Sequence, residues 1–205
     1  MENSNLENVK QEKYLGVIIN SKLSWLPHSK MISGRANFKR QFLERNLRTC
    51  NRDIKLQSYK NYVRPMIEYA SPIWDTDSKN VVQKVENVQR KAARFIMNNY
   101  DRHCSVSKMI KELNLDSLEL RCKVKKLKIM HSIKSEKTFL SNVTKPTYAR
   151  NKTKFKPIHA RVQSYAVSFI PSVIEQWNKL PVEILNINDT AIFENSTLEY
   201  YRDLY

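Results

Sequence analysis

Residues 59–74 read YKNYVRPMIEYASPIW, and residues 81–96 read VVQKVENVQRKAARFI. The first segment is aromatic and contains prolines, whereas the second has the period of an amphipathic helix. On a helical wheel, the apolar residues of the second segment fall within about 140° of arc. These apolar residues are Val81, Val82, Val85, Val88, Ala92, Phe95 and Ile96. The far side carries a basic stripe, in which Glu86 is the only nearby acid: Lys84, Arg90, Lys91 and Arg94. The pattern predicts a helix that buries one face and presents a positive one.

The composition favours an anionic partner for this basic stripe. The chain has 205 residues and a net charge of +16, and its pI is near 9.8. Self-repulsion of this size opposes compaction, and binding to an anion relieves it. Nucleic acid is the usual partner of such a chain, a membrane surface is the second candidate, and a merely solvated basic face is the bland alternative. No apolar run approaches the roughly 18 residues of a membrane-spanning helix.

Cysteine and glycine usage narrows the class further. The three cysteines are far apart and odd in number: Cys50, Cys104 and Cys122. This argues against a disulfide framework and for a reducing compartment. The polar stretch 1–13 lacks the apolar core of a signal peptide, so we expect an intracellular location, nuclear or cytoplasmic. Gly16 and Gly34 are the only glycines, which excludes Gly-rich phosphate loops and disfavours a multi-turn β architecture.

The predicted fold is mainly α, a helical bundle with one short N-terminal β segment and an irregular basic stretch. Residues 14–19 are β-prone and have no good partner strand in the chain. Because a lone strand is unstable, it fits a sheet whose other members lie elsewhere. Pro27 suits the first turn of a helix that ends near Leu47. The next helix contains Pro65, which should kink it or end its first half. The apolar positions of the first helix are Met31, Ile32, Ala36, Phe38, Phe42, Leu43 and Leu47.

Two later helices are predicted from caps and apolar spacing. Asp77 is a plausible cap for the helix at 81–96, and Asp116 with Glu119 forms a capping pair for a helix over 117–134. The second of these helices has two apolar sides, so we expect it to pack between neighbours. Four of its lysines are expected to reach out to solvent by their stems: Lys123, Lys125, Lys126 and Lys128.

Residues 137–174 contain no acid but seven Lys or Arg, with aromatic residues interleaved. Prolines break any helical periodicity there, so we predict a loop or tether. Basic and aromatic residues together can pair with phosphates and stack on bases. The alternative is a basic linker that touches nothing specific. Beyond it we expect a helix over residues 173–180, with Trp177 inward, and a weak helix within 189–205.

No arrangement of residues predicts catalysis, a metal or a cofactor. Two-metal chemistry needs clustered carboxylates, and the nearest case is Asp75-Thr76-Asp77, in a turn where aspartates commonly cap helices. His103-Cys104 lacks the spacing of a zinc ligand set. The remaining carboxylates are expected to cap helices or join salt bridges; examples are Glu68, Glu86, Glu112 and Glu119.

Four blocks of sequence carry a family resemblance. They are KYLGV at 13–17 with Leu23-Ser24-Trp25 and His28; residues 59–74; VQRKAARFI at 88–96; and SFIP at 168–171 with WNKLP at 177–181. In this order they resemble the region that follows the catalytic palm in reverse transcriptases of non-LTR (LINE) retrotransposons, especially jockey-like ones. The similarity covers residues 13–185.

The resemblance implies that Tyr14, Leu15, Gly16 and Val17 lie at the palm edge that supports the primer end. It also implies that residues 26–96 are thumb-like, a helical layer gripping the template–primer duplex. The orphan strand fits this, because its sheet would be the palm. In this family the polymerase acids lie upstream of the KYLGV block, so we expect a fragmentary retroelement product without its own catalytic aspartates and without the family's endonuclease domain.

We therefore expect four segments: 1–25, the polar N-terminus and palm-edge strand; 26–135, the helical thumb-like domain; 136–166, the basic loop or linker; and 167–205, a C-terminal helical segment. The expected partners are RNA, DNA or an RNA–DNA hybrid, together with the missing palm, and no membrane. The predicted nucleic-acid-binding residues are Lys84, Arg90, Lys91, Arg94, Lys30, Lys39, Arg40, Lys152 and Lys154.

Two other hypotheses stay open at this point. One is a helical protein-interaction module anchored by Tyr59, Tyr62, Tyr69 and Trp74. The other is a non-functional retroelement relic that folds poorly alone and exposes apolar surface where the palm would sit.

Overall fold

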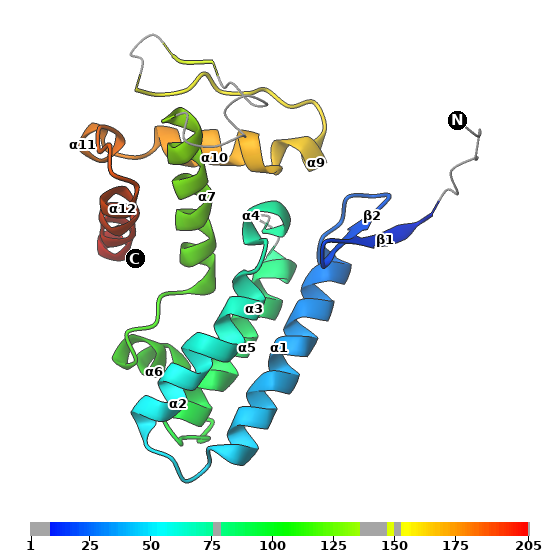
Figure 1. Cartoon of the computed structure of the whole chain (residues 1–205), viewed down its shortest axis with the longest axis vertical. Coiled ribbons are helices and arrows are strands. Elements are labelled where there is room, and N and C mark those ends of the chain that lie inside the picture. Colours follow the sequence, from blue (N-terminus) through cyan, green and yellow to red (C-terminus); the bar gives the residue numbers. More distant parts are fainter. Residues whose placement is uncertain (1–8, 76–78, 136–146, 150–152, 205) are drawn as a thin grey trace.

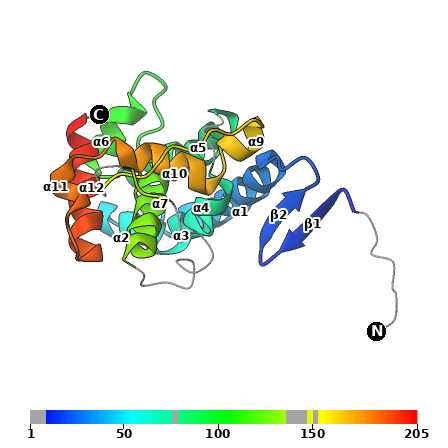
Figure 2. The ribbon, with the colours of Figure 1, turned by 90° about the horizontal axis from the view of Figure 1, so that it is seen from above.

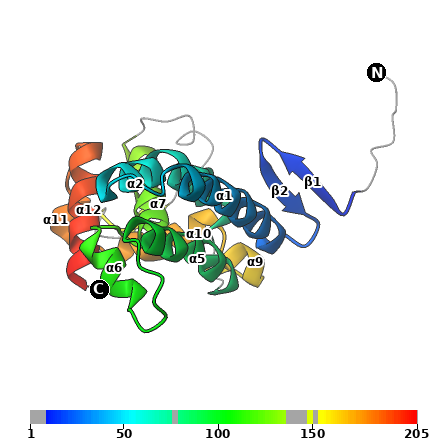
Figure 3. The same cartoon turned by 90° about the horizontal axis from the view of Figure 1, so that it is seen from below.

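The computed structural model describes residues 9–75, 79–135, 147–149 and 153–204. The chain is mainly helical, with one small antiparallel sheet near its N-terminus, as predicted. A first group of helices leads into a long helix, α7, which carries the chain to a second group (Figure 1). The hairpin and α12 lie at opposite ends of the molecule (Figures 2 and 3). The elements are β1 (Gln11–Tyr14), β2 (Val17–Asn20), α1 (Leu26–Asn46), α2 (Arg52–Ser58), η1 (Tyr59–Val63), α3 (Arg64–Glu68), α4 (Ser71–Trp74), α5 (Lys79–Ile96), α6 (Val106–Glu112), α7 (Leu118–Lys134), α9 (Gln163–Ala166), α10 (Phe169–Asn178), α11 (Val182–Leu185) and α12 (Thr190–Leu204).

Helix α5 buries the apolar face that its sequence predicts. Every residue of that face is buried except Val82, which is half-buried. One polar residue joins the face: the amide of Gln89 accepts a hydrogen bond from the Tyr59 hydroxyl at 2.8 Å and donates one to the Asp116 carbonyl at 2.9 Å. A buried amide is tolerated when both of its ends are paired. The face packs on α1 and forms the first hydrophobic core with α1, η1, α3 and α6.

The helical segment widens for one turn just before Pro65. Residues 59–63 form a π-helical turn, in which the Arg64 N–H donates to the Tyr59 carbonyl five residues back. Proline lacks an N–H and its ring clashes with the carbonyl four residues earlier, and a π turn is one way to absorb such a break. At Pro65, where we predicted a kink or the end of a helix, the structure shows a change of helix type, with Tyr59 and Val63 of the π turn buried.

Helix α7 packs between neighbours, as its two apolar sides predict. Leu118 lies in the first core, whereas Leu120 and the apolar residues after it lie in the second. Its N-cap is Ser117, whose hydroxyl accepts the Leu120 N–H at 3.1 Å. The expected Asp116 cap is wrong by one residue, because Asp116 instead pairs with Arg202 of α12 at 2.6 Å.

The prediction that four α7 lysines reach out to solvent is wrong for Lys126. Its side chain is 2% exposed, and its ammonium contacts the Asp75 carboxylate at 2.8 Å and the Asp75 carbonyl at 2.7 Å. The other three also have partners: Lys125 pairs with Glu68 at 2.8 Å, Lys128 with Glu194 at 2.6 Å, and Lys123 lies over the Tyr201 ring. Each ion-paired lysine meets an acid that is distant in sequence, and a helical wheel of α7 alone does not include these acids.

Glu68 joins α3 to α7 through a buried cluster of charges. Its carboxylate is 7% exposed and accepts hydrogen bonds from Arg121 and Lys125, with Arg64 at 3.6 Å. Burial alone would raise the pKa of Glu68, but the hydrogen bonds from Arg121 and Lys125 outweigh it and hold that pKa below its ordinary value.

The second core forms around Trp177, which is fully buried, as predicted. It packs against Phe155 and Phe193 with ring centroids 5.5 Å away in each case. Phe155 comes from the basic stretch and is itself 1% exposed. Asn178 clamps its backbone, donating to the Phe155 carbonyl at 2.8 Å and accepting its N–H at 3.0 Å. The described part of this stretch is thus largely irregular, as predicted, but it is anchored to α10.

The prediction of a strand without a partner is wrong, because β1 and β2 form an antiparallel hairpin. The turn residues Leu15 and Gly16 have φ values of 45° and 84°, the left-handed conformation that a tight hairpin turn requires. Two contacts join the hairpin to the helices: the Tyr69 hydroxyl donates to the Leu15 carbonyl at 2.8 Å, and the Ile18 N–H donates to His28 Nδ1 at 3.2 Å. Burial lowers the pKa of His28, which keeps Nδ1 available as an acceptor.

The hairpin turn yields the first prediction. Replacing Leu15 by Asn should stabilise the hairpin by about 0.5–1 kcal/mol, because Asn tolerates the left-handed region far better than Leu does. Gly16→Ala should destabilise it by about 1 kcal/mol, because its φ is strained for any residue with a Cβ. Amide hydrogen exchange at Tyr14 and Val17 would measure both effects, and equal exchange in the two variants would contradict the turn geometry.

The second prediction concerns the buried carboxylate of Glu68. Glu68→Gln should destabilise the fold by about 2–3 kcal/mol near neutral pH, because it leaves Arg121 and Lys125 without their anion. This loss is smaller than that for a fully buried ion pair, because both cations are partly exposed to solvent. A folded-state pKa below 4.5 gives stability that is complete above pH 4.5 and lost as the pH falls further. The gap between wild type and this variant should therefore narrow below pH 4.5, measured by urea unfolding.

Glu86 supplies the matched control, since it is half-buried and has the opposite shift. Burial raises its pKa, despite the hydrogen bond from the Leu118 N–H. A raised pKa makes the wild type gain stability as the pH falls toward 4.5. The free energy of unfolding of the wild type, minus that of Glu86→Gln, should therefore increase as the pH falls from 7 toward 4.5. Parallel trends in the two variants would refute the assigned charge states.

Candidate nucleic-acid interface

The predicted basic stripe lies along α5, on the side away from its buried face. Lys84 and Lys91 are both exposed and lie seven residues apart, about 10 Å along the helix axis. Arg90 is exposed as well. Arg94 is half-buried, and its guanidinium donates to the Asp101 carbonyl at 2.6 Å. The structure therefore exposes three of the four predicted residues to solvent.

The acid nearest to the stripe in sequence is turned inward. The Glu86 carboxylate accepts the Leu118 N–H at 3.0 Å and a hydrogen bond from Gln89 at 3.3 Å, so it caps the start of α7 from another helix. Lys84 and Lys91 make no ion pair with any residue that the structure describes. Their ammonium groups are left for a ligand from solution.

Arg90 has a more mixed environment than the two lysines. It lines a hollow of about 760 Å³ between α5 and α7, together with Glu86, Glu119 and Lys123. Opposite charges there partly cancel the attraction for a phosphate. The most open positive surface on α5 is thus at Lys84 and Lys91.

The three predicted residues of α1 occupy different environments. Lys30 is exposed. Lys39 is half-buried, with its ammonium 5.5 Å from the Phe42 ring centroid and 5.9 Å from that of Tyr62. Arg40 is buried and pairs with Glu44 at 2.5 Å. Arg40 is therefore committed to its own helix and does not face solvent as Lys30 does.

The two candidates in the basic stretch are less informative. Lys152 lies outside the described residues. Lys154 is half-buried beside the buried Phe155, and its carbonyl accepts the Ala149 N–H at 2.8 Å. Because the neighbouring Phe155 backbone is hydrogen-bonded to Asn178, the backbone of Lys154 is held close to α10.

The residues that the resemblance assigns to primer-end support form the hairpin turn. Tyr14 and Leu15 are exposed, Gly16 is half-buried against the Tyr69 ring, and Val17 is buried. Of the four anchors of the protein-docking alternative, Tyr59 and Trp74 are 1% exposed and belong to the core. Only the other two, Tyr62 and Tyr69, are accessible from solvent.

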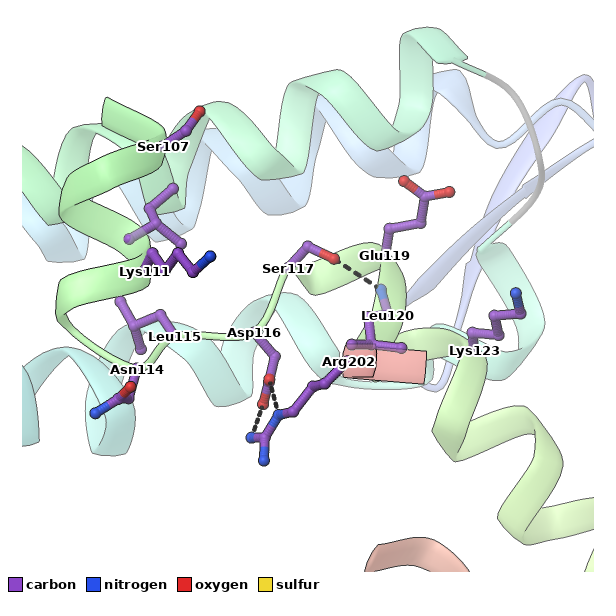
Figure 4. A pocket seen from close by; sticks show the side chains of 11 residues that line it. Ser107, Lys111, Asn114, Leu115, Asp116, Ser117, Glu119, Leu120, Lys123 and Arg202 are labelled. Carbon is purple, nitrogen blue, oxygen red and sulfur yellow. Dashed lines mark hydrogen bonds and ion pairs between the residues drawn. The ribbon is translucent and has the colours of Figure 1, made fainter. Parts of the chain in front are cut away.

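A hollow of about 690 Å³ lies between α6, α7 and α12, and its wall contains an ion pair (Figure 4). Arg202 donates two hydrogen bonds to the Asp116 carboxylate, at 2.6 and 2.9 Å, and this pairing raises the pKa of Arg202. The Ser117 hydroxyl in the wall is the α7 cap, as Figure 4 shows. Charged groups that satisfy each other in this way suit a structural contact between helices.

The metal candidates of the sequence are also accounted for where the structure describes them. Asp75 pairs with Lys126, and Asp77 lies outside the described residues. Within the described ranges, no three His, Cys, Asp or Glu side chains gather as a metal site would require. None of the helices in the same ranges is long and apolar enough to cross a bilayer.

A group of exposed aromatic residues was not predicted. Phe38 and Phe42 were expected on the apolar side of α1, but both are exposed. The buried side of α1 instead runs through Ile32, Ala36 and Leu43. A signal was present in the sequence, because Arg35, Phe38, Phe42 and Arg45 recur at spacings of three and four residues and so share one helix face.

Comparison with known proteins adds no relative to this picture. No protein-family model, curated protein or solved structure matches the chain. The resemblance to LINE-type reverse transcriptases therefore remains a proposal, based on the four blocks of sequence that carry it.

Proposed function

We propose that this chain is a nucleic-acid-binding helical module, the thumb and downstream part of a LINE-type RNA-directed DNA polymerase. Its role is to grip a template–primer duplex through phosphate contacts, and we assign it no catalytic residue. The partners are RNA, DNA or their hybrid. The observation that carries the proposal is the outer face of α5, where Lys84 and Lys91 are exposed and unpaired among the described residues.

The rigidity of α5 supports this role. Its opposite face packs on α1 and contributes to the first core along its whole length. Lysines on such a helix keep a constant separation of about two turns, which suits contacts to the regularly spaced phosphates of a duplex. The net charge of +16 adds a long-range attraction that does not depend on sequence.

The test is the salt dependence of binding. Lys84→Ala combined with Lys91→Ala should weaken binding to an RNA–DNA hybrid by about tenfold at 50 mM salt. It should also reduce the slope of log K against log salt by about 2, because each lost phosphate contact removes about 0.9 from that slope. Fluorescence anisotropy at 50 and 200 mM salt measures both quantities.

A second double variant controls for the loss of net charge. Lys108 and Lys111 are exposed on α6 and make no ion pair with the described residues, so Lys108→Ala with Lys111→Ala removes the same two charges from another surface. This control should bind nearly as the wild type does. If both double variants lower the slope equally, the stripe has no special role; if a folded wild type does not bind at 50 mM salt, the proposed function is wrong.

A further inference from the structure

The surface of α1 and η1 carries an aromatic strip, which we define as Phe38, Phe42 and Tyr62. The three side chains are 68%, 47% and 57% exposed. Phe38 and Phe42 are four residues apart, one above the other on α1, and Tyr62 joins them from η1 through Lys39, whose ammonium approaches the rings of both Phe42 and Tyr62. Three large rings gathered on one surface are unusual for a solvated helix face.

Positive charges flank this strip on the same helix face. Arg35 precedes Phe38 by three residues, Arg45 follows Phe42 by three, and both are exposed. The Lys39 ammonium lies near the rings of Phe42 and Tyr62. The strip therefore alternates flat apolar surfaces with cationic groups over about 15 Å of helix.

The acids near the strip are few and turned aside. Glu44 is the only acid of α1, and its carboxylate is held by Arg40 at 2.5 Å and by the Tyr100 hydroxyl at 2.6 Å. That contact lies toward the segment after α5, whereas Lys39 contacts η1. On the η1 side, Asp53 shares a shallow hollow with Tyr62. The charge over Phe38 and Phe42 is thus positive.

We propose that the aromatic strip binds single-stranded nucleic acid. Bases stack on Phe38, Phe42 and Tyr62, and Arg35, Lys39 and Arg45 hold the backbone phosphates. Flat rings interleaved with cations are the combination that unpaired bases and their phosphates require. A duplex offers phosphates but keeps its base faces stacked, so it would use only the charges. This goes beyond the proposed grip on a duplex, which rests on α5.

The first experiment compares two ligands and two double variants. Phe38→Ala with Phe42→Ala should weaken binding to a labelled 12-nucleotide oligo(U) by about tenfold or more, as loss of two stacked bases implies. Binding to the RNA–DNA hybrid should change by less than about twofold. Ile73 and Ile192 are also exposed apolar residues on other elements, so Ile73→Ala with Ile192→Ala controls for lost apolar surface and should bind both ligands as the wild type does.

A second measurement detects stacking directly. Phe38→Trp places an indole in the strip, and its fluorescence should be quenched when oligo(U) binds. Ile192→Trp is the control and should show no added quenching, because its position on α12 lies outside the strip. This readout needs no loss of affinity and does not depend on whether the alanine variant folds.

Three results would overturn the proposal. They are no binding of oligo(U) by a wild type that is folded, equal losses on single strand and hybrid, or no quenching in Phe38→Trp. Concentration-dependent self-association that disappears in the alanine variants, with oligo(U) binding intact, would assign the strip to a second copy of the chain. The proposed duplex grip is tested separately, because binding of the hybrid should weaken when Lys84 and Lys91 are replaced and should not change when the aromatic strip is replaced.

Discussion

The arrangement of this molecule depends on one buried carboxylate, Glu68, and the cations that surround it. Glu68 ends α3 in the first helical group, and Arg121 and Lys125 reach it from α7, which carries the second core. The contact thus ties together two hydrophobic cores that divide near Leu118. A buried anion without its partners is expensive, so this site fixes the angle and register at which α7 can leave the first group.

The same principle governs where the positive charge of the chain appears. The acids Glu68, Asp75, Glu86 and Asp116 each meet a partner within the fold: a cation for three of them, and the start of α7 for Glu86. Carboxylates paired inside the fold cannot neutralise lysines outside. The excess positive charge of +16 therefore lies on outward helix faces such as that of α5. Folding in this way turns a property of composition into a property of particular surfaces, and it raises the local field where a polyanion could approach.

The sequence predicted the features that repeat along one helix and missed those that join distant segments. The wheel of α5 gave its buried face, and Trp177 was correctly placed inside. Strand β1 was missed because all four of its residues are exposed, so it has no apolar alternation to recognise. Lys126 was expected in solvent because nothing near it in sequence indicates Asp75. On α1, the apolar set expected from the sequence contained both Ile32 and Phe38, and only the packing of the helix shows that Ile32 is buried and Phe38 exposed.

The two surfaces that we assign to nucleic acid differ in what they offer, and this constrains any ligand that uses both. Helix α1 packs on α5, which presents Lys84 and Lys91, and it also meets η1, where Lys39 approaches Tyr62. A rigid duplex on α5 offers its phosphates, but it keeps its base faces stacked and so cannot use the aromatic rings of the strip. A flexible single strand that continues from the end of that duplex leaves its base faces free to stack on those rings. The two surfaces are therefore best matched together by a junction between duplex and single strand, with the paired part on α5 and the unpaired part on α1.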